Sequence, residues 1–389
     1  LLLADSREYT LAGHLEMLSD PGGNLTFAEV IGPAVGRFHP LPGFLGLGYN
    51  NQTVWLRFSF SRTEAYHDEC YLRLGPAFLD YLTVYVQEGA DPRDPRAYRD
   101  YRLGDHLPAA NRPVRHPQYV VPIQLPTLGE RTVYLRLQST SALELFGAIL
   151  PPAEMVSHID ANILYSGAYL GITLAIVLVN LIYFLRLRDP VIGYYVLYVT
   201  ALFVNYLGAE GLIVLFWPDQ AHRLADYLTV LGMSGSFIFM ALFAMRLFNT
   251  GRERSWPHRY FQYVILVGLL PILAVAFGWY GRVAVFLMVN GLGLIVVMTG
   301  LSIRLVRRGE LGGKIYLLAF SLSNLGFAVT FLRLLTFLPV NLLTSHAMQT
   351  GTALNMVLIS LAMTERLHAA LKQAVAVSLG AESRAVKLA

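Results

Sequence analysis

Charged residues are scarce in this chain of 389 residues: they make up 14% of it, against 55% hydrophobic residues. A soluble domain carries about 25% charged residues, so the composition argues against an ordinary cytosolic enzyme. Cysteine is nearly absent too, since Cys70 is the only one, and no disulfide can form within the chain. Cys70 lies in a run that alternates apolar and polar residues, where we expect a small buried side chain.

The few charges are unevenly distributed. Residues 1–158 hold more acidic than basic side chains, and the rest of the chain holds more basic than acidic ones. The basic excess lies in short loops between apolar runs, which favours membrane orientation and argues against a nucleic-acid partner. We therefore expect a chain built from two different architectures.

The first 158 residues have the pattern of an all-β domain. Apolar residues alternate with other residues at 54–60, 70–74, 82–86 and 133–138, which predicts half-buried strands. Proline and glycine separate these runs. Short strands with this spacing predict a β-sandwich or jelly roll, and the long segment 89–117 is expected to be a connection crossing one end of it.

From residue 159 onward, apolar runs of about 20 residues follow one another, the length that crosses a hydrocarbon core of ~30 Å. They predict an all-α domain of seven transmembrane helices over residues 159–366, with spans at residues 162–185, 190–208, 225–247, 260–280, 282–304, 314–336 and 343–365. Loop arginines gather on one side of these spans, at 186–188, 246–259 and 304–308. Since cytoplasmic loops are rich in Lys and Arg, we expect the β-domain outside the cytoplasm and the C-terminus inside.

The last predicted span continues beyond the membrane as a cytoplasmic signalling helix, residues 367–389. Residues 343–379 contain no proline and one glycine, so a helix can run through them. An apolar stripe follows one face of this helix, formed by Leu367, Leu371, Val375 and Leu379. A parallel copy of the same helix is its simplest partner, which predicts a homodimer; the alternative is a tail without a partner.

The order of these parts resembles the bacterial seven-transmembrane receptors with diverse intracellular signalling modules, and the β-domain is similar to their jelly-roll-like type-2 extracellular domain. The resemblance covers nearly the whole chain. In the β-domain it rests on the motifs at 54–58, 71–75, 79–85 and 133–139, and in the helices on Asn180, Arg188-Asp189, Tyr194-Tyr195 and residues 361–366.

This resemblance implies a receptor in the bacterial inner membrane with a periplasmic N-terminal domain. It also implies a cytoplasmic effector, a histidine kinase or a diguanylate cyclase, carried in cis or as a separate signalling protein. The sequence reaches Ala389 without such a domain and begins at Leu1 rather than at methionine. We expect a piece of a longer protein, and no enzyme in this chain itself.

The candidate ligand site lies on the non-core side of the predicted strands. If these strands share one sheet, aromatic rings that can stack on a sugar alternate with arginines that can bind a carboxylate or phosphate. The candidates are Trp55, Arg57, Tyr71, Arg73, Tyr81, Tyr85, Tyr134 and Arg136. The expected ligand is a glycan or a small anion; the alternative is that these side chains cover a sheet face or a domain contact.

No cofactor and no metal ion is predicted. Asp105, His106 and His116 lie close together in sequence, but a metal site needs about three convergent ligands, and the chain has no pair of histidines at helical metal-binding spacing. Charged side chains near the outer ends of the spans are instead candidates for coupling the β-domain to the helices: Glu210, Asp226, Arg282, Arg333 and His346.

The alternative function is a transporter or channel with an extracytoplasmic substrate-binding domain. Such proteins carry charges near the membrane midplane or matched broken helices. Pro271 interrupts one predicted span, but no matching interruption stands out elsewhere. An intramembrane enzyme would need a paired nucleophile and base, and the spans offer no such pair.

Overall fold

The computed structural model describes residues 1–365, except residues 5, 6, 51, 64, 65, 67, 126–128, 254, 277–279, 311, 335, 336 and 339–341. The chain forms two compact units. The first contains Leu1–Ala168, Ala201–Ser234 and Leu270–Phe286, and the second contains Tyr169–Thr200, Gly235–Leu269 and the chain from Leu287 onward. The first unit therefore combines the β-domain with short stretches of the helical region.

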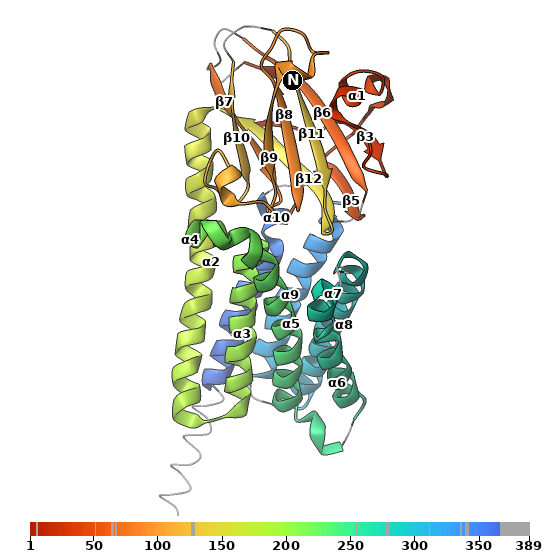
Figure 1. Cartoon of the computed structure of the whole chain (residues 1–389). Helices are drawn as coiled ribbons and strands as arrows, with labels where there is room; N and C mark the ends of the chain where they lie inside the picture. The colour runs from red at the N-terminus through yellow and green to blue at the C-terminus, as the bar shows by residue number, and fades with distance from the viewer. Residues whose placement is uncertain are drawn as a thin grey trace, which may run out of the picture. The chain divides into compact units, whose positions relative to one another are not determined.

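Two β-sheets make up the β-domain (Figure 1). The first sheet has the order β4 (His39–Pro40), β3 (Glu16–Asp20), β6 (Thr53–Arg62), β11 (Arg131–Gln138), β8 (Tyr81–Gln87) and β9 (Tyr98–Leu103), with β1 (Leu2–Leu3) paired to β6. The second has the order β10 (Tyr119–Gln124), β7 (Glu69–Gly75), β12 (Ala142–Leu150) and β2 (Tyr9–Thr10), with β5 (Leu45–Tyr49) paired to β12.

The period-two pattern of the sequence explains why these sheets have a common core. On β6, Leu56 and Phe58 are at most 2% exposed, and Leu56 pairs with Leu135 of β11, which pairs in turn with Val84 of β8. Inward side chains of the second sheet, such as Leu72 of β7, belong to the same apolar cluster. The prediction of an all-β sandwich for the first part of the chain is confirmed.

One predicted feature of the β-domain is wrong. Residues 89–117 are not simply a connection, because β9 lies within them and pairs along its length with β8. The reason is that β9 is an edge strand in which half of the side chains are exposed and the buried ones, at its two ends, do not alternate with them, so the strand carries little hydrophobic alternation.

The helical region follows the β-domain with almost no connection. Strand β12 ends at Leu150, and the helix that follows it begins at Pro152, so Pro151 alone lies between them. The elements are α2 (Pro152–Leu187), α3 (Pro190–Ala209), α4 (Ile213–Phe216), α5 (Ala221–Leu247), α6 (Trp256–Gly268), α7 (Leu270–Ala276), α8 (Tyr280–Arg307), α9 (Gly313–Leu334), α10 (Leu342–Ser345) and a helix over residues 347–365.

Five segments of the described helices are long and apolar enough to cross a membrane: Leu164–Leu187, Pro190–Ala209, Pro218–Leu247, Val289–Arg307 and Gly313–Arg333. They correspond to five of the seven predicted spans. The predicted span 260–280 falls on α6 and α7, which are separated at Leu269, and Pro271 lacks the N–H that a continuous helix would use there. The predicted span 343–365 falls on α10 and the helix 347–365, with His346 between them. The count of seven therefore stays a prediction.

The predicted signalling helix, with Leu367, Leu371, Val375 and Leu379, lies outside the described residues.

Candidate functional site

Five of the eight predicted ligand-binding residues meet on the outer face of the first sheet. Tyr134 of β11 lies opposite both Arg57 of β6 and Tyr85 of β8, and Arg136 of β11 lies opposite Trp55 of β6. The expected interleaving of aromatic and arginine side chains is therefore present on this face for these five residues.

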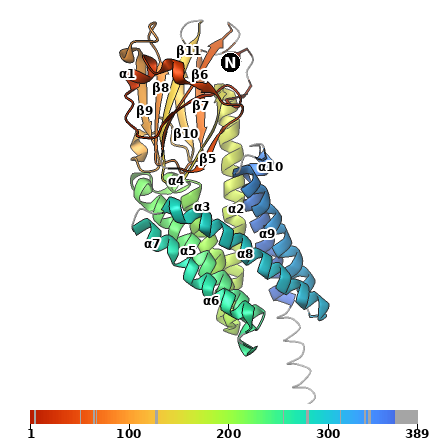
Figure 2. The same ribbon diagram turned by 90° about the vertical axis from the view of Figure 1, so that its right-hand side faces the viewer.

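A segment of the chain itself covers this face. Residues 25–38, which include the short helix α1 (Phe27–Ile31), pack across it (Figure 2). The Phe27 ring stacks on Tyr85 with centroids 4.0 Å apart and planes 5° apart. As a result Trp55 is only 1% exposed and Tyr134 only 5%. Phe27 thus occupies the place over Tyr85 where a sugar ring could stack.

The polar groups under this segment are bonded within the chain. Arg57 forms an ion pair with Glu16, donates to the Val35 carbonyl oxygen over 3.2 Å, and lies over the Phe38 ring at 4.5 Å. Trp55 Nε1 lies 3.4 Å from an Asp20 carboxylate oxygen. These contacts are those of a covered sheet face, the alternative considered above, and ligand binding here stays a prediction.

The prediction assumed that all the candidate strands share one sheet. Tyr71 and Arg73 do not meet this condition. Their strand, β7, lies in the second sheet. Arg73 forms a 2.8 Å ion pair with Glu8, and Tyr71 packs against Leu150 and Met155, where β12 passes into α2. Alternation shows that Tyr71 and Arg73 share a side of their strand, but it does not reveal which sheet the strand joins.

The eighth candidate, Tyr81, belongs to a different site. It is the first residue of β8, is 44% exposed, and presents its ring edge-on to the His106 ring with centroids 5.6 Å apart. Because β8 and β9 are antiparallel neighbours, with Leu82 opposite Leu103, the residues before β8 meet the residues after β9. We call Asp80, Asp105 and His106 the loop cluster.

The loop cluster is held by backbone contacts between its two loops. Asp105 N–H donates to the Leu79 carbonyl over 2.9 Å, and His106 N–H donates to the Asp80 carbonyl over 3.4 Å. Gly104 has a φ of +143°, and a Cβ there would lie 2.0 Å from the Asp80 carbonyl oxygen. Only glycine allows the two loops to come this close. One donor atom from each of the three side chains then lies within 4.8 Å of the other two.

Asp80 is the most firmly held member of the loop cluster. Its side chain is buried, and one carboxylate oxygen accepts from the Ser139 hydroxyl over 2.8 Å. The other accepts from the Thr140 N–H over 2.9 Å and from the Thr140 hydroxyl over 2.7 Å. These bonds hold the Asp80 carboxylate in one orientation.

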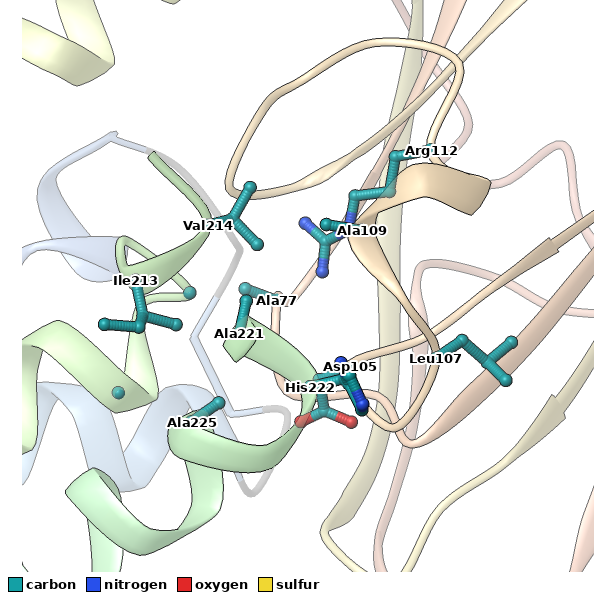
Figure 3. Close-up of a pocket in the computed structure, with 12 residues that line it drawn as sticks. Ala77, Asp105, Leu107, Ala109, Arg112, Ile213, Val214, Ala221, His222 and Ala225 are labelled. Atoms are coloured by element: carbon teal, nitrogen blue, oxygen red, sulfur yellow. The ribbon is translucent and has the colours of Figure 1, made fainter. Parts of the chain in front are cut away.

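Asp105 is less well satisfied. It lines a small cavity of the first unit together with Arg112 and with residues of the segment 208–225, among them His222 (Figure 3). Three buried polar atoms on this lining have no hydrogen-bond partner among the described residues: Asp105 Oδ1, Arg112 Nε and His222 Nδ1. Burial, reinforced by the carboxylates of Asp226 and Asp80, raises the pKa of Asp105 above its usual range. Buried groups of this kind are rare in folded proteins and mark candidate sites.

His106 connects the loop cluster to α5. Its Nε2 lies 2.9 Å from an Asp226 carboxylate oxygen, and this hydrogen bond raises the pKa of His106. Nearby, Arg115 Nε donates to the Val214 carbonyl over 3.3 Å. The side chains of α4 and the start of α5 form a small apolar cluster with Ala109 of the β-domain. Asp226, a predicted coupling residue, therefore contacts the β-domain directly.

The other predicted coupling residues are placed differently. Glu210 lies in the first unit, directly after α3. Arg333, in α9, and His346, between α10 and the helix 347–365, belong to the second unit. Arg282 lies within α8, but its side chain is outside the described part of the structure.

Sequence reasoning missed the position of Asp80 beside Asp105 and His106. The three residues are separated by a whole strand pair, and no spacing rule connects them. The available signal was an aspartate directly before one strand and a Gly-Asp-His sequence, residues 104–106, directly after another. Recognising β9 as the antiparallel neighbour of β8 would have brought them together.

Comparison with known protein families gives two matches, one in each of the two parts of the chain. The family described as 7TM diverse intracellular signalling matches residues 162–366, more than half of the chain, and the family described as 7TMR-DISM extracellular 2 matches residues 12–149. Both matches are to receptor-type domains. No curated protein matches the chain.

Proposed function

Because this chain belongs to the family of seven-transmembrane receptors with diverse intracellular signalling modules, we propose that its β-domain receives an extracytoplasmic signal and its helices pass the signal to a cytoplasmic effector. We place the protein in the bacterial inner membrane, crossing it seven times, with the β-domain in the periplasm and the C-terminus in the cytoplasm. The arginine-rich loops on one side of the spans support this orientation.

The observation that carries the proposal is the His106–Asp226 contact between a loop of the β-domain and the start of α5. A ligand can shift a two-state receptor only by binding its two states with different affinities. A ligand that moves the loops around β8 and β9 changes this contact, and through it the position of α5. The passage of β12 into α2 offers a second route for the same movement.

The output that we propose is a change in spacing within a homodimer. The apolar stripe of residues 367–379 would pair with the same stripe of a second copy and align a histidine kinase or diguanylate cyclase, carried in cis or by a separate protein. The proposed ligand is a small molecule or glycan. The covered face of the first sheet would bind a sugar only if residues 25–38 moved away from it.

The orientation is tested by labelling engineered cysteines in intact spheroplasts with a membrane-impermeant maleimide. In a Cys70→Ala background, Asp91→Cys in the β-domain should react at once, and Ser383→Cys in the tail should react only after lysis. If both positions react in intact cells, the proposed arrangement is wrong.

Transmission is tested by pulsed electron paramagnetic resonance on the full chain in nanodiscs, with a spin label at Val375→Cys. Asp226→Asn weakens the contact with His106 and should change the distance between labels in the two copies. Asp219→Asn, an exposed aspartate shortly before α5, is the matched control and should leave the distance unchanged. Equal distances in wild type and Asp226→Asn would contradict transmission through this contact.

A further inference from the structure

The loop cluster has the composition of a metal site rather than that of an ordinary polar loop. Two carboxylates and one imidazole converge from two loops, with one donor atom of each within 4.8 Å of the others. In a loop that is ordered only by its own hydrogen bonds, few buried acceptor atoms lack a donor. Here Asp105 Oδ1 is buried and has no partner among the described residues.

The surroundings of the loop cluster also suit a metal ion. Ligands of bound metals are oriented by hydrogen bonds from neighbouring residues, and a metal-bound histidine usually gives its second ring nitrogen to a carboxylate. Asp80 is oriented by Ser139 and Thr140. His106 shares its Nε2 with Asp226, which leaves Nδ1 as the nitrogen for a metal ion.

Carboxylates converge near the ring of His106: those of Asp80, Asp105 and Asp226 all act on it electrostatically. The cations nearby include Arg112, which lines the same cavity as Asp105, and the protonated form of His106 itself. A divalent cation on the loop cluster would take the place of the proton that these carboxylates favour on His106, because a metal-bound imidazole is neutral.

We propose that Asp80, Asp105 and His106 bind a divalent transition-metal cation of the Zn²⁺ or Mn²⁺ type, and that Asp226 is a positioning residue acting through His106. The imidazole selects this class, because Ca²⁺ and Mg²⁺ prefer sites made of oxygen atoms alone. Water would complete the coordination. Binding of the ion stands on the loop cluster alone; its action as an input signal rests on the proposed receptor function.

If the ion binds, it fixes the ring of His106 and with it the hydrogen bond to Asp226 on α5. The ion would then favour the receptor state in which the β-domain loops hold the start of α5. This adds a second class of input to the small molecule or glycan proposed above: a metal cation bound at the loop cluster.

The experiment is a metal titration of the full chain in nanodiscs after chelator treatment and dialysis. Zn²⁺ binding is followed by competition with a chromophoric chelator, and Mn²⁺ and Ca²⁺ are tested in parallel. Wild type should bind a single Zn²⁺ per chain. Asp105→Asn and His106→Ala should lower the affinity at least about 100-fold, and Asp226→Asn about 10- to 100-fold, as expected for a residue that positions a ligand.

The matched controls are Asp100→Asn and His39→Ala, both in exposed positions of the same sheet, and both should bind Zn²⁺ like wild type. Circular dichroism melting without metal checks that each variant is folded. Asp105→Asn keeps the side-chain shape, and His106→Ala provides a second, independent variant.

Three results would overturn the proposal: no stoichiometric Zn²⁺ binding by wild type, unchanged affinity in both folded Asp105→Asn and His106→Ala, or tighter binding of Ca²⁺ than of Zn²⁺. None of these measurements depends on signalling. A receptor that binds Zn²⁺ without any change in the spacing of its tails would contradict the input role and leave the metal site standing.

Discussion

Two regions of the β-domain gather side chains of kinds that bind ligands, and they differ in how the polar atoms of these side chains are bonded. The outer face of the first sheet combines aromatic rings with arginines, and the rings are stacked and the arginine Arg57 is bonded within the chain. The loop cluster combines carboxylates with histidine and leaves the buried Asp105 Oδ1 without a partner among the described residues. Residue types alone therefore did not distinguish a covered surface from a candidate site; the bonding state of their polar atoms did.

The largest effect on stability is expected from removing a buried ring on the covered face of the first sheet, which packs like a hydrophobic core. Trp55→Ala removes a buried ring and should lower the free energy of unfolding of the β-domain by about 3–5 kcal/mol. Hydrogen exchange of β6 amides in the full chain measures this free energy of unfolding. Trp217→Ala, at a residue 57% exposed, should change the free energy of unfolding little. A loss below about 1 kcal/mol in Trp55→Ala would show that this face is not a core.

His116 provides the next test, because it is a buried histidine whose ring has a hydrogen-bond partner, in contrast to Asp105 Oδ1, which has none among the described residues. Its buried Nδ1 accepts from the Gln118 N–H over 3.0 Å, and burial lowers its pKa from 6.5 to about 4. Between these values the unfolded chain binds the proton and the folded chain does not. The neutral His116 therefore makes its full contribution to the free energy of unfolding above pH 6.5. As pH falls toward 4, this contribution is lost, by up to about 3 kcal/mol.

The measurement is hydrogen exchange of β10 amides across this pH range. His116→Gln should be less sensitive to acid than wild type, whereas His39→Gln, at an exposed position, should follow wild type. Parallel pH curves for wild type and His116→Gln would contradict a neutral, buried His116.

Metal addition sharpens the contrast between the two regions. Zn²⁺ at 100 times its Kd should stabilise a folded state that binds it by about 2.7 kcal/mol. This gain should appear as slower exchange of amides in β8 and β9, which flank the loop cluster. Asp105→Asn should lose the gain and Thr26→Ala, on the covered face, should keep it. An equal gain in Asp105→Asn would mean that Zn²⁺ binds elsewhere.

The smallest effect is expected at the segment that covers the first sheet. The Thr26 hydroxyl caps α1 by accepting from the Glu29 N–H, and the Thr26 N–H in turn donates to the Glu29 carboxylate. Thr26→Ala should weaken α1 by about 1 kcal/mol and speed proteolysis within residues 25–38, and Thr26→Ser should restore wild-type behaviour. Unchanged proteolysis would show that contacts such as Phe27 on Tyr85, rather than the cap, hold the segment.

Local patterns predicted much of the fold. Alternation located β6, β7, β8 and β11, because one face of each strand enters the common core. Hydrophobic length located five segments that can cross a membrane. The exposed edge strand β9 escaped notice, since a strand that buries little has little alternation.

The candidate sites were less predictable, because they depend on contacts between distant parts of the chain. Tyr71 and Arg73 have the same local pattern as Trp55 and Arg57, yet their strand joins the other sheet. Asp105 and His106 were noticed, but Asp80 enters only through the pairing of β8 with β9. Asp226 was noticed from its position at the end of a predicted span, but its contact with His106 joins two distant segments of the chain and could not be read from the local pattern.

The passage from β12 to α2 has a mechanical consequence. Pro151 is the single residue between strand and helix, and both it and Pro152 have a fixed φ angle. The Met155 N–H donates to the Pro151 carbonyl over 3.0 Å, and Met155 packs with Leu150. This junction has no flexible linker, so we expect a tilt of β12 to move the first turn of α2 with it.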